Sequence, residues 1–320
     1  MLENQRVYVA GHSGLVGTAI VQRLLMAGHD TLVTRKRKDL DLTDVGATRR
    51  FFQEEKPDIV ILAAARVGGI LANKSYPAAF ICENLSIQNN VIQEAWKAGV
   101  QNLLFLGTSC IYPKHARQPI SEEFLLSGSL EPSNRPYALA KIAGIEMCWS
   151  FNRQYATRYL AVMPCNLYGP GDSYDLQNSH VLPALIRKAH VAKKNGEQEL
   201  SVWGTGHPLR ELLFVSDLAD ACVFILSQAA HNLKYLFNDR EPPLINIGSG
   251  IECSIRQLAE IVCDVVGFKG RLKFDESKPD GTPRKLLDLS RINNLGWQST
   301  TPLRDGIVQA YQDYLARYEK

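Results

Sequence analysis

Two hydroxyl residues, Thr108 and Ser109, precede a tyrosine and a lysine, Tyr137 and Lys141, in the middle of this chain. Tyrosine and lysine four positions apart on a helix share one face. An ammonium beside the phenol favours the phenolate, so we expect Tyr137 to exchange a proton near neutral pH. A hydroxyl from Thr108 or Ser109 is suited to hold a substrate oxygen against that phenol. These residue types together predict proton transfer at a substrate oxygen.

A glycine-rich turn, Gly11-His12-Ser13-Gly14-Leu15-Val16-Gly17, follows a short apolar strand and begins a helical pattern that runs from Leu15 to Met26. Its three glycines permit a tight turn, close backbone approach to a pyrophosphate and close packing of the helix. The helix N-terminus supplies amide donors to the phosphates. A plain strand–helix turn is the alternative interpretation. A dinucleotide cradle combined with the tyrosine and hydroxyl predicts hydride transfer at a carbonyl carbon.

The end of the second expected strand, near Thr31–Thr34, carries the basic run Thr34-Arg35-Lys36-Arg37. A site that prefers NAD usually has an acid at this position to hold the ribose 2′-hydroxyl. Cations suit a 2′-phosphate instead, so the sequence predicts NADP(H) rather than NAD. A basic surface loop is the alternative explanation of this run.

Alternating strands and helices predict a doubly wound parallel sheet, a Rossmann-type α/β fold. Ligands in such sheets bind at the carboxyl ends of the strands, where both the glycine turn and Thr108–Cys110 fall. The expected strands lie at Arg6–Ala10, Asp58–Ala63, Leu103–Leu106 and Tyr159–Met163, and the expected helices at Val45–Glu55, Pro77–Ala98 and Pro136–Gln154.

The pattern loosens after Pro164 and predicts a smaller C-terminal α/β domain that covers the substrate. We expect an NADP-binding domain over residues 1–165, with return segments near 211–248, and a mainly substrate-binding domain over 166–320. The elements expected there are His180–Lys194, Ser201–Trp203, Leu212–Val215, Leu244–Ile247, Ser254–Val266 and Pro302–Tyr318, with Tyr168–Asp172 as a loop.

Composition excludes several classes of function. The net charge of +3 over 320 residues is too small to argue for nucleic acid, and no apolar stretch approaches the length of a membrane helix. The seven cysteines form no C-x-x-C pair, which argues against a disulfide framework and against a zinc or other metal site. With no signal-peptide pattern at the start, a reduced, cytoplasmic setting is expected.

The glycine turn, the Thr108–Ser109 region and the Tyr137–Lys141 pair resemble the extended short-chain dehydrogenase/reductase superfamily. Nearly the whole chain is similar to the GDP-L-fucose synthase family. The stretches that carry this closer resemblance are Ala63–Ile70, Ser109–Pro113, Pro136–Gly144, Met163–Pro170, Asn178–Val181, Val202–Gly204, Pro208–Glu211 and Lys278–Lys285.

The resemblance implies three steps in one pocket. Two epimerisations, at carbons 3 and 5 of GDP-4-keto-6-deoxy-D-mannose, precede NADPH-dependent reduction at carbon 4 to GDP-L-fucose. Tyr137 would protonate the C4 oxygen, and Lys141 would hold the nicotinamide ribose and tune Tyr137. Cys110 and His180 would be the acid/base pair of the epimerisations, with the assignment of acid and base left open. The family also implies a homodimer, for which Pro77–Ala98 and Pro136–Gln154 are candidate packing faces.

The resemblance also places the binding residues. Those for the GDP-sugar are Lys188, Trp203, Arg210 and Asp280; those for the cofactor are Gly11, His12, Ser13, Gly14, Leu15, Val16, Gly17, Arg37, Asp41, Leu42, Lys141, Pro164, Cys165, Asn166, Leu167 and His180. Two positions depart from the family. Thr108 stands where serine is more common but keeps the hydroxyl, and Lys188 replaces an arginine, which retains the charge and loses bidentate geometry.

The chemistry independently suits this assignment. Removing a proton beside a ketone makes an enolate, which must be reprotonated on the opposite face of the ring. A thiol and an imidazole both transfer protons near pH 7, so Cys110 and His180 are suitable residue types. The hydroxyl and tyrosine polarise the C4 oxygen, which stabilises the enolate and the reduction transition state alike.

Other functions remain as alternatives at this stage. A nucleotide-sugar 4,6-dehydratase is disfavoured, because it would normally have an acid after the hydroxyl position, where this chain has Ser109 and Cys110. A 3,5-epimerase of the same superfamily would re-reduce its sugar without net consumption of NADPH. A non-catalytic dinucleotide sensor would have no need of Tyr137 and Lys141. Cys110, His180 and Trp203 also have the ordinary structural interpretation of buried or satisfied side chains.

Overall fold

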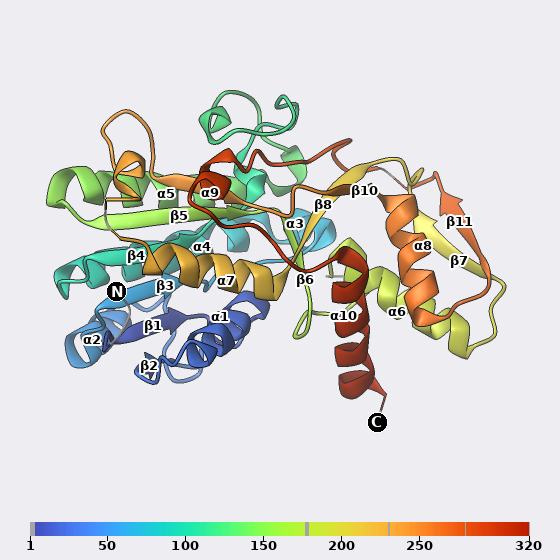
Figure 1. Cartoon of the computed structure of the whole chain (residues 1–320), viewed down its shortest axis with the longest axis horizontal. Coiled ribbons are helices and arrows are strands. Elements are labelled where there is room, and N and C mark those ends of the chain that lie inside the picture. The colour runs from blue at the N-terminus through green and yellow to red at the C-terminus, as the bar shows by residue number, and fades with distance from the viewer. Residues whose placement is uncertain (1–3, 177–178, 230, 279, 320) are drawn as a thin grey trace.

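A parallel sheet of six strands forms the larger part of the molecule (Figure 1). The computed structural model describes residues 4–176, 179–229, 231–278 and 280–319; Asn178 and Pro279, which belong to two of the family motifs, lie outside them. The strand order reverses between β1 and β3, and ligands bind at such a reversal. In spatial order the strands are β2 (Leu32–Val33), β1 (Val7–Ala10), β3 (Ile59–Leu62), β4 (Asn102–Leu106), β5 (Arg158–Pro164) and β9 (Leu244–Ile247).

Helices cover both faces of this sheet, which confirms the predicted Rossmann-type doubly wound fold. On one face α1 packs against α7, and on the other α4 packs against both α2 and α5 (Figure 1). Local signals explain two of the helix starts: Asp44 accepts a hydrogen bond from the Ala47 amide, and Pro77 occupies the first turn of α4. The bounds are α1 (Leu15–Met26), α2 (Val45–Glu55), α3 (Ile70–Ser75), α4 (Pro77–Lys97), α5 (Arg135–Tyr155) and α7 (Val215–Ser227).

A smaller body joins one end of the sheet and has its own hydrophobic core (Figure 1). It contains a three-stranded sheet, a two-stranded sheet and three long helices. The strands are β6 (Asn166–Tyr168), β7 (Glu199–Trp203), β8 (Leu209–Phe214), β10 (Glu252–Ser254) and β11 (Arg271–Asp275), and the helices are α6 (Val181–Lys194), α8 (Ile255–Val266) and α10 (Leu303–Tyr318). Helix α9 (Ser290–Asn294) belongs instead to the larger body, where it lies beside β9.

The larger core extends beyond the expected return segments. It includes the buried side chains of Leu287, Ile292 and Trp297, so the chain re-enters the larger body after β11. We propose that the first core belongs to the cofactor domain, residues 1–165 with the return segments near 211–248, and that the second belongs mainly to the substrate domain. The segment around Leu287 is then a further return that the sequence pattern did not predict.

Several helices and strands were missed because their local sequence signals are weak. Helix α7 begins at Val215, directly after β8, and its N-cap residue Phe214 makes no side-chain cap, so the polar cap that usually marks a helix start is absent. Strands β6 and β10 have three residues each, and α3 and α9 have six and five. Such short elements are defined by their partners in space rather than by periodicity.

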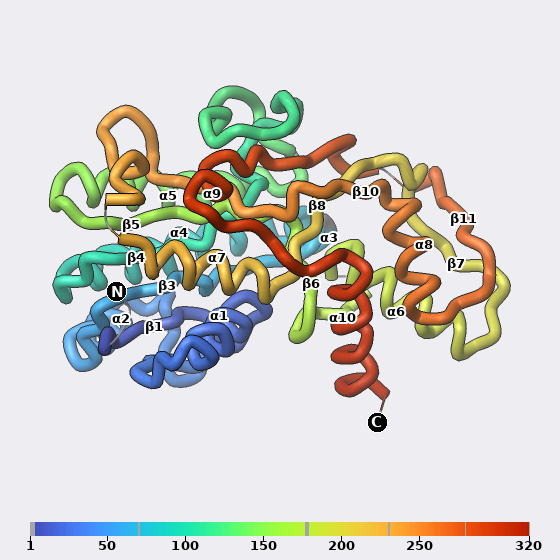
Figure 2. Tube along the Cα trace, in the orientation of Figure 1, coloured from blue at the N-terminus to red at the C-terminus, as the bar shows by residue number. Residues whose placement is uncertain are grey.

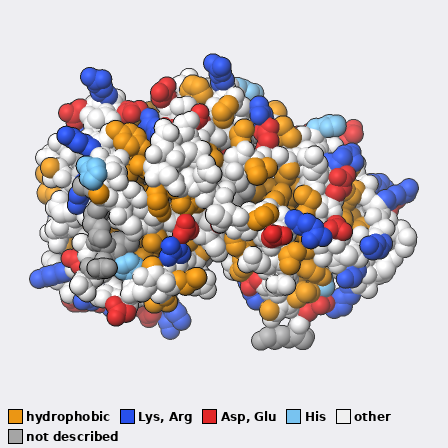
Figure 3. Space-filling model, in the orientation of Figure 1, with side chains coloured by type: hydrophobic (Ala, Val, Ile, Leu, Met, Phe, Trp, Pro, Cys, Tyr) orange, Lys and Arg blue, Asp and Glu red, His pale blue; other side chains and the backbone are white. Residues whose placement is uncertain are grey.

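The surface agrees with a modest net charge. On the face seen in Figure 3, acidic and basic side chains are interspersed rather than gathered into one patch of a single sign. A notch on the lower edge separates the larger body from the lobe that carries α10 (Figures 1 and 3). Within the described ranges, no helix is both long enough and apolar enough to span a bilayer.

Candidate active site

The glycine turn has the close packing that a dinucleotide site requires. Gly11 has a φ of +85°, and a Cβ atom on it would lie 2.6 Å from the Ala64 amide nitrogen. A Cβ on Gly17 would lie 2.1 Å from the Gly11 carbonyl oxygen, whereas one on Gly14 would lie 3.5 Å from that oxygen. Helix α1 has no side-chain cap and no acidic residue in its first turn. Its amides and positive dipole end are therefore suited to a pyrophosphate, and the residues present fit the predicted cofactor.

Gly17→Ala is expected to destabilise the protein by about 1–3 kcal/mol, because the new methyl group meets backbone rather than a movable side chain. Gly14→Ala is the matched control: Gly14 has an ordinary φ of −84°, and its added Cβ would make only van der Waals contact. Thermal unfolding of both variants, with and without NADPH, measures the difference. Equal melting temperatures for the two variants would contradict the crowding at Gly17.

The two arginines of the basic run after β2 make ion pairs of different lengths. Arg35 forms an ion pair with Glu55 and lies over the Phe51 ring at 5.7 Å from its centroid. The Arg37 side chain is 73% exposed and lies 3.9 Å from Asp41 and 3.8 Å from a Glu83 oxygen. Arg37 and the exposed Lys36 are thus the cations of this run that remain accessible to a 2′-phosphate, and the ion pairs of Arg37 are long.

The other predicted cofactor residues lie on the loops at the carboxyl ends of the strands. Asp41 accepts hydrogen bonds from the Thr43 amide at 2.9 Å and from the Thr43 hydroxyl at 2.8 Å. These hydrogen bonds, the one from the amide most strongly, lower the pKa of the Asp41 carboxyl. The Leu42 carbonyl accepts a hydrogen bond from Asn90 at 2.8 Å. The segment Pro164–Leu167 joins β5 to β6, and the Cys165 amide donates to the Ile247 carbonyl.

Thr108 interacts with two other predicted catalytic residues, Cys110 and Tyr137. Its Oγ1 accepts a hydrogen bond from the Cys110 amide at 3.3 Å, and its side chain also acts to lower the pKa of the Tyr137 phenol. Ser109, at the start of a short 3₁₀ helix (Ser109–Ile111), is only 3% exposed. Of the two hydroxyls proposed from sequence, the structure therefore favours that of Thr108.

The expectation that Lys141 lowers the pKa of Tyr137 is wrong. Lys141 Nζ is buried, donates to the Leu106 carbonyl at 2.7 Å and lies 4.7 Å from the Phe105 ring centroid. Burial lowers the pKa of Lys141 to about 7, and burial, followed by the Cys110 charge, raises the pKa of Tyr137 despite its bond to Thr108. The phenol is therefore protonated at neutral pH, which is the state needed to donate a proton to a developing alkoxide.

A residue that sequence analysis did not single out, Lys285, contacts the Cys110 thiol. Lys285 Nζ lies 3.5 Å from Cys110 Sγ. Burial opposes ionisation of the thiol, but the Lys285 charge and hydrogen bonds from Thr108, Lys285 and Asn134 outweigh it, so the pKa of Cys110 is below its usual value. Cys110, Asn134 and Lys285 line a recess of about 350 Å³. The position of Lys285 within the Lys278–Lys285 motif was the available signal in the sequence.

His180 comes from the smaller body, at the N-cap position of α6. The protein around the imidazole lowers its pKa, since desolvation disfavours the charged ring, and a helix N-terminus also disfavours a cation. Both influences favour the neutral form of the His180 imidazole. Its pairing with Cys110 across a bound sugar remains a prediction.

The structure brings the four predicted sugar-nucleotide residues together at one end of the smaller body. Lys188 lies 5.2 Å from the centroid of the half-exposed Trp203 ring. Asp280 binds the amide and hydroxyl of Thr205, two positions beyond Trp203, at 3.0 and 2.8 Å. Asp280 also interacts electrostatically with Arg210, whose guanidinium donates to the Thr282 carbonyl. An exposed aromatic ring beside cations suits a nucleobase and a diphosphate.

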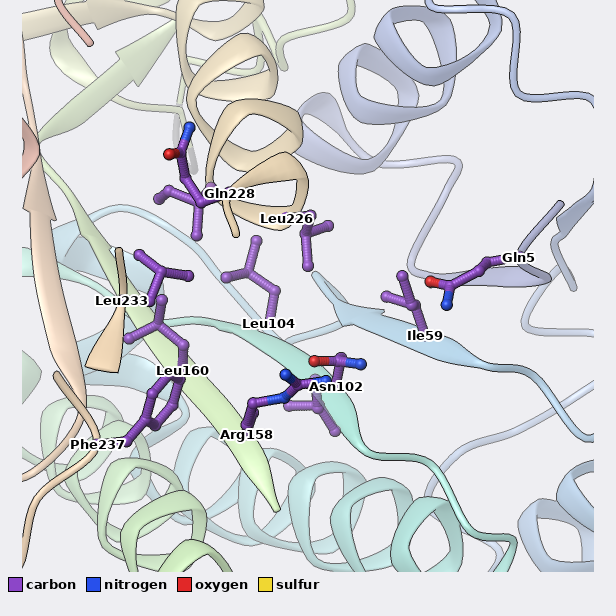
Figure 4. Close-up of a pocket in the computed structure, with 12 residues that line it drawn as sticks. Gln5, Ile59, Asn102, Leu104, Arg158, Leu160, Leu226, Gln228, Leu233 and Phe237 are labelled. Atoms are coloured by element: carbon purple, nitrogen blue, oxygen red, sulfur yellow. The ribbon is translucent and has the colours of Figure 1, made fainter. Parts of the chain in front are cut away.

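A second, larger recess lies at the amino ends of the sheet strands, and Figure 4 shows residues that line it. Its empty volume is about 630 Å³, and Ile59, Asn102 and Arg158, which start or lie near the starts of β3, β4 and β5, line it. Arg158 is its one titratable lining residue within the described chain, and none of the predicted site residues lies there. The predicted site residues on the larger sheet lie instead at the carboxyl ends of the strands.

Comparison with known proteins agrees with this geometry. The model of the NAD dependent epimerase/dehydratase family matches residues 7–248. GDP-L-fucose synthase 1 of Arabidopsis thaliana is 54% identical over 313 residues, which cover 98% of this chain and 94% of that protein. The chain belongs to the NAD dependent epimerase/dehydratase family.

Within the NAD dependent epimerase/dehydratase family, the similarity to GDP-L-fucose synthases is close. The GDP-L-fucose synthase of Escherichia coli is 49% identical over 321 residues and is matched over 100% of this chain and 99% of its own. The solved structure of a GDP-L-fucose synthetase from Naegleria fowleri bound to NADP superposes with a TM-score of 0.88 at 28% identity, covering 100% of this chain and 97% of that chain. The predicted family and fold are confirmed.

Proposed function

We propose that this enzyme catalyses 3,5-epimerisation of GDP-4-keto-6-deoxy-D-mannose and then its NADPH-dependent reduction at carbon 4 to GDP-L-fucose. The observation that carries the proposal is one group, Tyr137, Thr108 and Cys110: the Thr108 hydroxyl accepts from the Cys110 amide, and the Thr108 side chain acts to lower the pKa of both the protonated phenol and the activated thiol. A simple reductase has no need of the thiol. The near full-length similarity to GDP-L-fucose synthases supports the same substrate class.

Each protein group has a defined task in this proposal. The glycine turn and α1 bind the pyrophosphate, and Lys188, Trp203, Arg210 and Asp280 hold the GDP portion of the sugar nucleotide. When bound, NADPH supplies the hydride for carbon 4. Thr108 and Tyr137 hold the C4 oxygen, which carries negative charge both in the enolate and during reduction.

Proton transfer follows from the ionisation states. The Cys110 thiolate removes a proton from carbon 3 or 5, and the electron pair moves onto the C4 oxygen as the enolate forms. Reprotonation on the opposite face completes each epimerisation, with His180 as the proposed second acid/base residue. Tyr137 then donates its proton to the C4 oxygen during reduction. Lys141 donates a hydrogen bond to the Leu106 carbonyl at the end of β4. We propose that it also contacts the nicotinamide ribose.

NADPH absorbance during incubation with GDP-4-keto-6-deoxy-D-mannose, followed by identification of the sugar, tests the function. Stoichiometric loss of NADPH with formation of GDP-L-fucose is expected. Loss of NADPH with an unepimerised product, GDP-rhamnose, would keep the reductase and remove the epimerase roles of Cys110 and His180. Epimerisation with no net loss of NADPH would instead indicate a 3,5-epimerase.

Arg37 is the proposed partner of the cofactor 2′-phosphate. Arg37→Ala is expected to raise KM for NADPH about tenfold and leave KM for NADH nearly unchanged, because one charge-assisted hydrogen bond is lost. Arg35→Ala is the matched control, since Arg35 is engaged by Glu55. Steady-state kinetics with both cofactors measure the ratio; an unchanged NADPH-to-NADH preference in Arg37→Ala would contradict the role.

We further propose a cytoplasmic homodimer. The seven cysteines are free, as expected for a reducing compartment, and the family resemblance suggests packing through α4 and α5. Analytical ultracentrifugation that finds only monomer at micromolar concentration would overturn the dimer.

A further inference from the structure

The segment that carries Lys285 returns from the smaller body to the larger one. Figure 2 shows the chain leaving β11 and running back along the larger body to α9. Beside this segment lies the loop after the short 3₁₀ helix Ser109–Ile111, and the two form a short parallel bridge between Ile120 and Leu287. The Ile120 amide donates to the Leu286 carbonyl at 2.8 Å, and the Asp288 amide donates to the Ile120 carbonyl at 2.9 Å.

Two side chains add to this docking. Gln118 Oε1 accepts a hydrogen bond from the Leu286 amide at 2.7 Å. Glu211, on β8 and fully buried, accepts hydrogen bonds from the Leu287 amide at 3.0 Å and from the Gly250 amide at 2.8 Å. A buried carboxylate is costly unless its oxygens are hydrogen-bonded, so its bond to Leu287 ties the returning segment to β8. Leu286 and Leu287 follow Lys285 directly and fix its position.

The charge of Lys285 is directed to the thiol and to no carboxylate. Its Nζ lies 3.5 Å from Cys110 Sγ, and no ion pair to it occurs within the described ranges. The other cations that line the same recess are paired: Lys114 lies 3.0 Å from Glu131, and Arg284 lies 2.8 Å from Glu252.

The remaining groups around Cys110 are neutral. They are the Tyr137 phenol, the Thr108 hydroxyl and the Asn134 amide, whose Oδ1 is buried and has no hydrogen-bond partner. Lys285 is therefore the full positive charge in contact with Cys110 among the described residues. An unpaired ammonium at this distance stabilises a thiolate strongly in a partly buried site.

We propose that Lys285, held by Gln118 and Glu211, is a positioning residue that keeps Cys110 as a thiolate and so prepares it as the base of the epimerisations. The inference rests on the proposed function for the identity of the reaction, but the contact between the two residues does not. In the proton transfer, the C–H bond of the sugar breaks, the proton joins Sγ and the electron pair moves to the C4 oxygen. Lys285 keeps its protons throughout and stabilises the starting thiolate.

The direct test is the pH profile of Cys110 alkylation by iodoacetamide, quantified on the Cys110 peptide by mass spectrometry. Lys285→Met is expected to slow alkylation at pH 7 about tenfold or more and to move the profile to higher pH. Raising the pKa of the Cys110 thiol by one unit lowers the fraction of thiolate at a fixed pH below the pKa about tenfold. Lys285→Arg is expected to retain most of the parental rate. Coincident profiles for the parent and Lys285→Met would overturn the proposal.

Two further variants separate charge from folding. Lys114→Met removes a cation that lines the same recess but is paired with Glu131, so its alkylation profile is expected to stay within about twofold of the parent. Gln118→Ala loosens the docking without touching the ammonium and is expected to slow alkylation by less than Lys285→Met does. If Lys114→Met slowed Cys110 alkylation as much as Lys285→Met does, the overall charge of the recess, and not Lys285, would control ionisation of the thiol.

A second readout links the pair to catalysis. Incorporation of solvent deuterium into carbons 3 and 5 is expected to fall about tenfold or more in Lys285→Met, while the Kd for NADPH stays within about twofold. Parental deuterium incorporation in Lys285→Met would contradict the positioning role. If the parent protein fails to turn over GDP-4-keto-6-deoxy-D-mannose but its alkylation profile still depends on Lys285, the proposed function fails and the coupling stands.

Discussion

Tyr137→Phe is expected to lower kcat for NADPH-dependent reduction by about 10²–10⁴-fold, the usual contribution of a positioned general acid. The phenol is protonated because burial raises its pKa, so the substitution removes the donor to the C4 oxygen. The ring is expected to keep its edge-on packing against Phe80, at 6.2 Å between centroids. Epimerisation is expected to fall less, because Thr108 still holds the C4 oxygen.

The measurement is NADPH oxidation together with solvent deuterium incorporation, which separates reduction from epimerisation. Tyr155→Phe, near the end of the same helix and on its exposed side, is the matched control and is expected to behave like the parent. A kcat for Tyr137→Phe within threefold of the parent would remove Tyr137 as the acid. A variant with no turnover that still supported cellular function would favour the dinucleotide-sensor alternative.

Cys110→Ser is expected to lower deuterium incorporation at carbons 3 and 5 by about 10²–10⁴-fold, while reduction continues on the unepimerised sugar. A serine hydroxyl is far less acidic than a thiol, so the ammonium of Lys285 cannot supply an anion at this position near pH 7. The residual product is expected to be the unepimerised 6-deoxy sugar nucleotide. Product analysis by NMR measures this change.

Cys82→Ser controls for the general effect of removing a thiol, because Cys82 is exposed on α4, far along the chain from the catalytic group. It is expected to retain parental rates of both partial reactions. Formation of GDP-L-fucose at the parental rate by Cys110→Ser would contradict the assignment and would leave the thiol a structural role.

Much of the cofactor domain is predictable because its signals are local. Helix α2 occupies Val45–Glu55 and strand β9 occupies Leu244–Ile247, as expected from their patterns. Asp44 caps α2 and Pro77 starts α4, and both act within one turn of their own position. Helix α7 escaped prediction because it follows β8 directly and its N-cap residue, Phe214, has no polar side chain to cap the first turn.

The catalytic group shows where local reasoning ends. Spacing correctly places Tyr137 and Lys141 on one helix, but burial turns the lysine toward the Leu106 carbonyl, and the expected lowering of the pKa of the tyrosine is not found. Desolvation depends on everything packed around a group, and no four-residue pattern contains that information.

The order of elements, the glycine turn and the identity of the reacting side chains follow from residues close together in the chain, since turn geometry, helix periodicity and functional-group chemistry are local. The pairing of Lys285 with Cys110 joins residues 175 positions apart. It exists because Gln118 and Glu211 dock the returning segment on the larger body. Only the tertiary structure settles such a contact, because electrostatic interactions act through space and their strength depends on burial and distance.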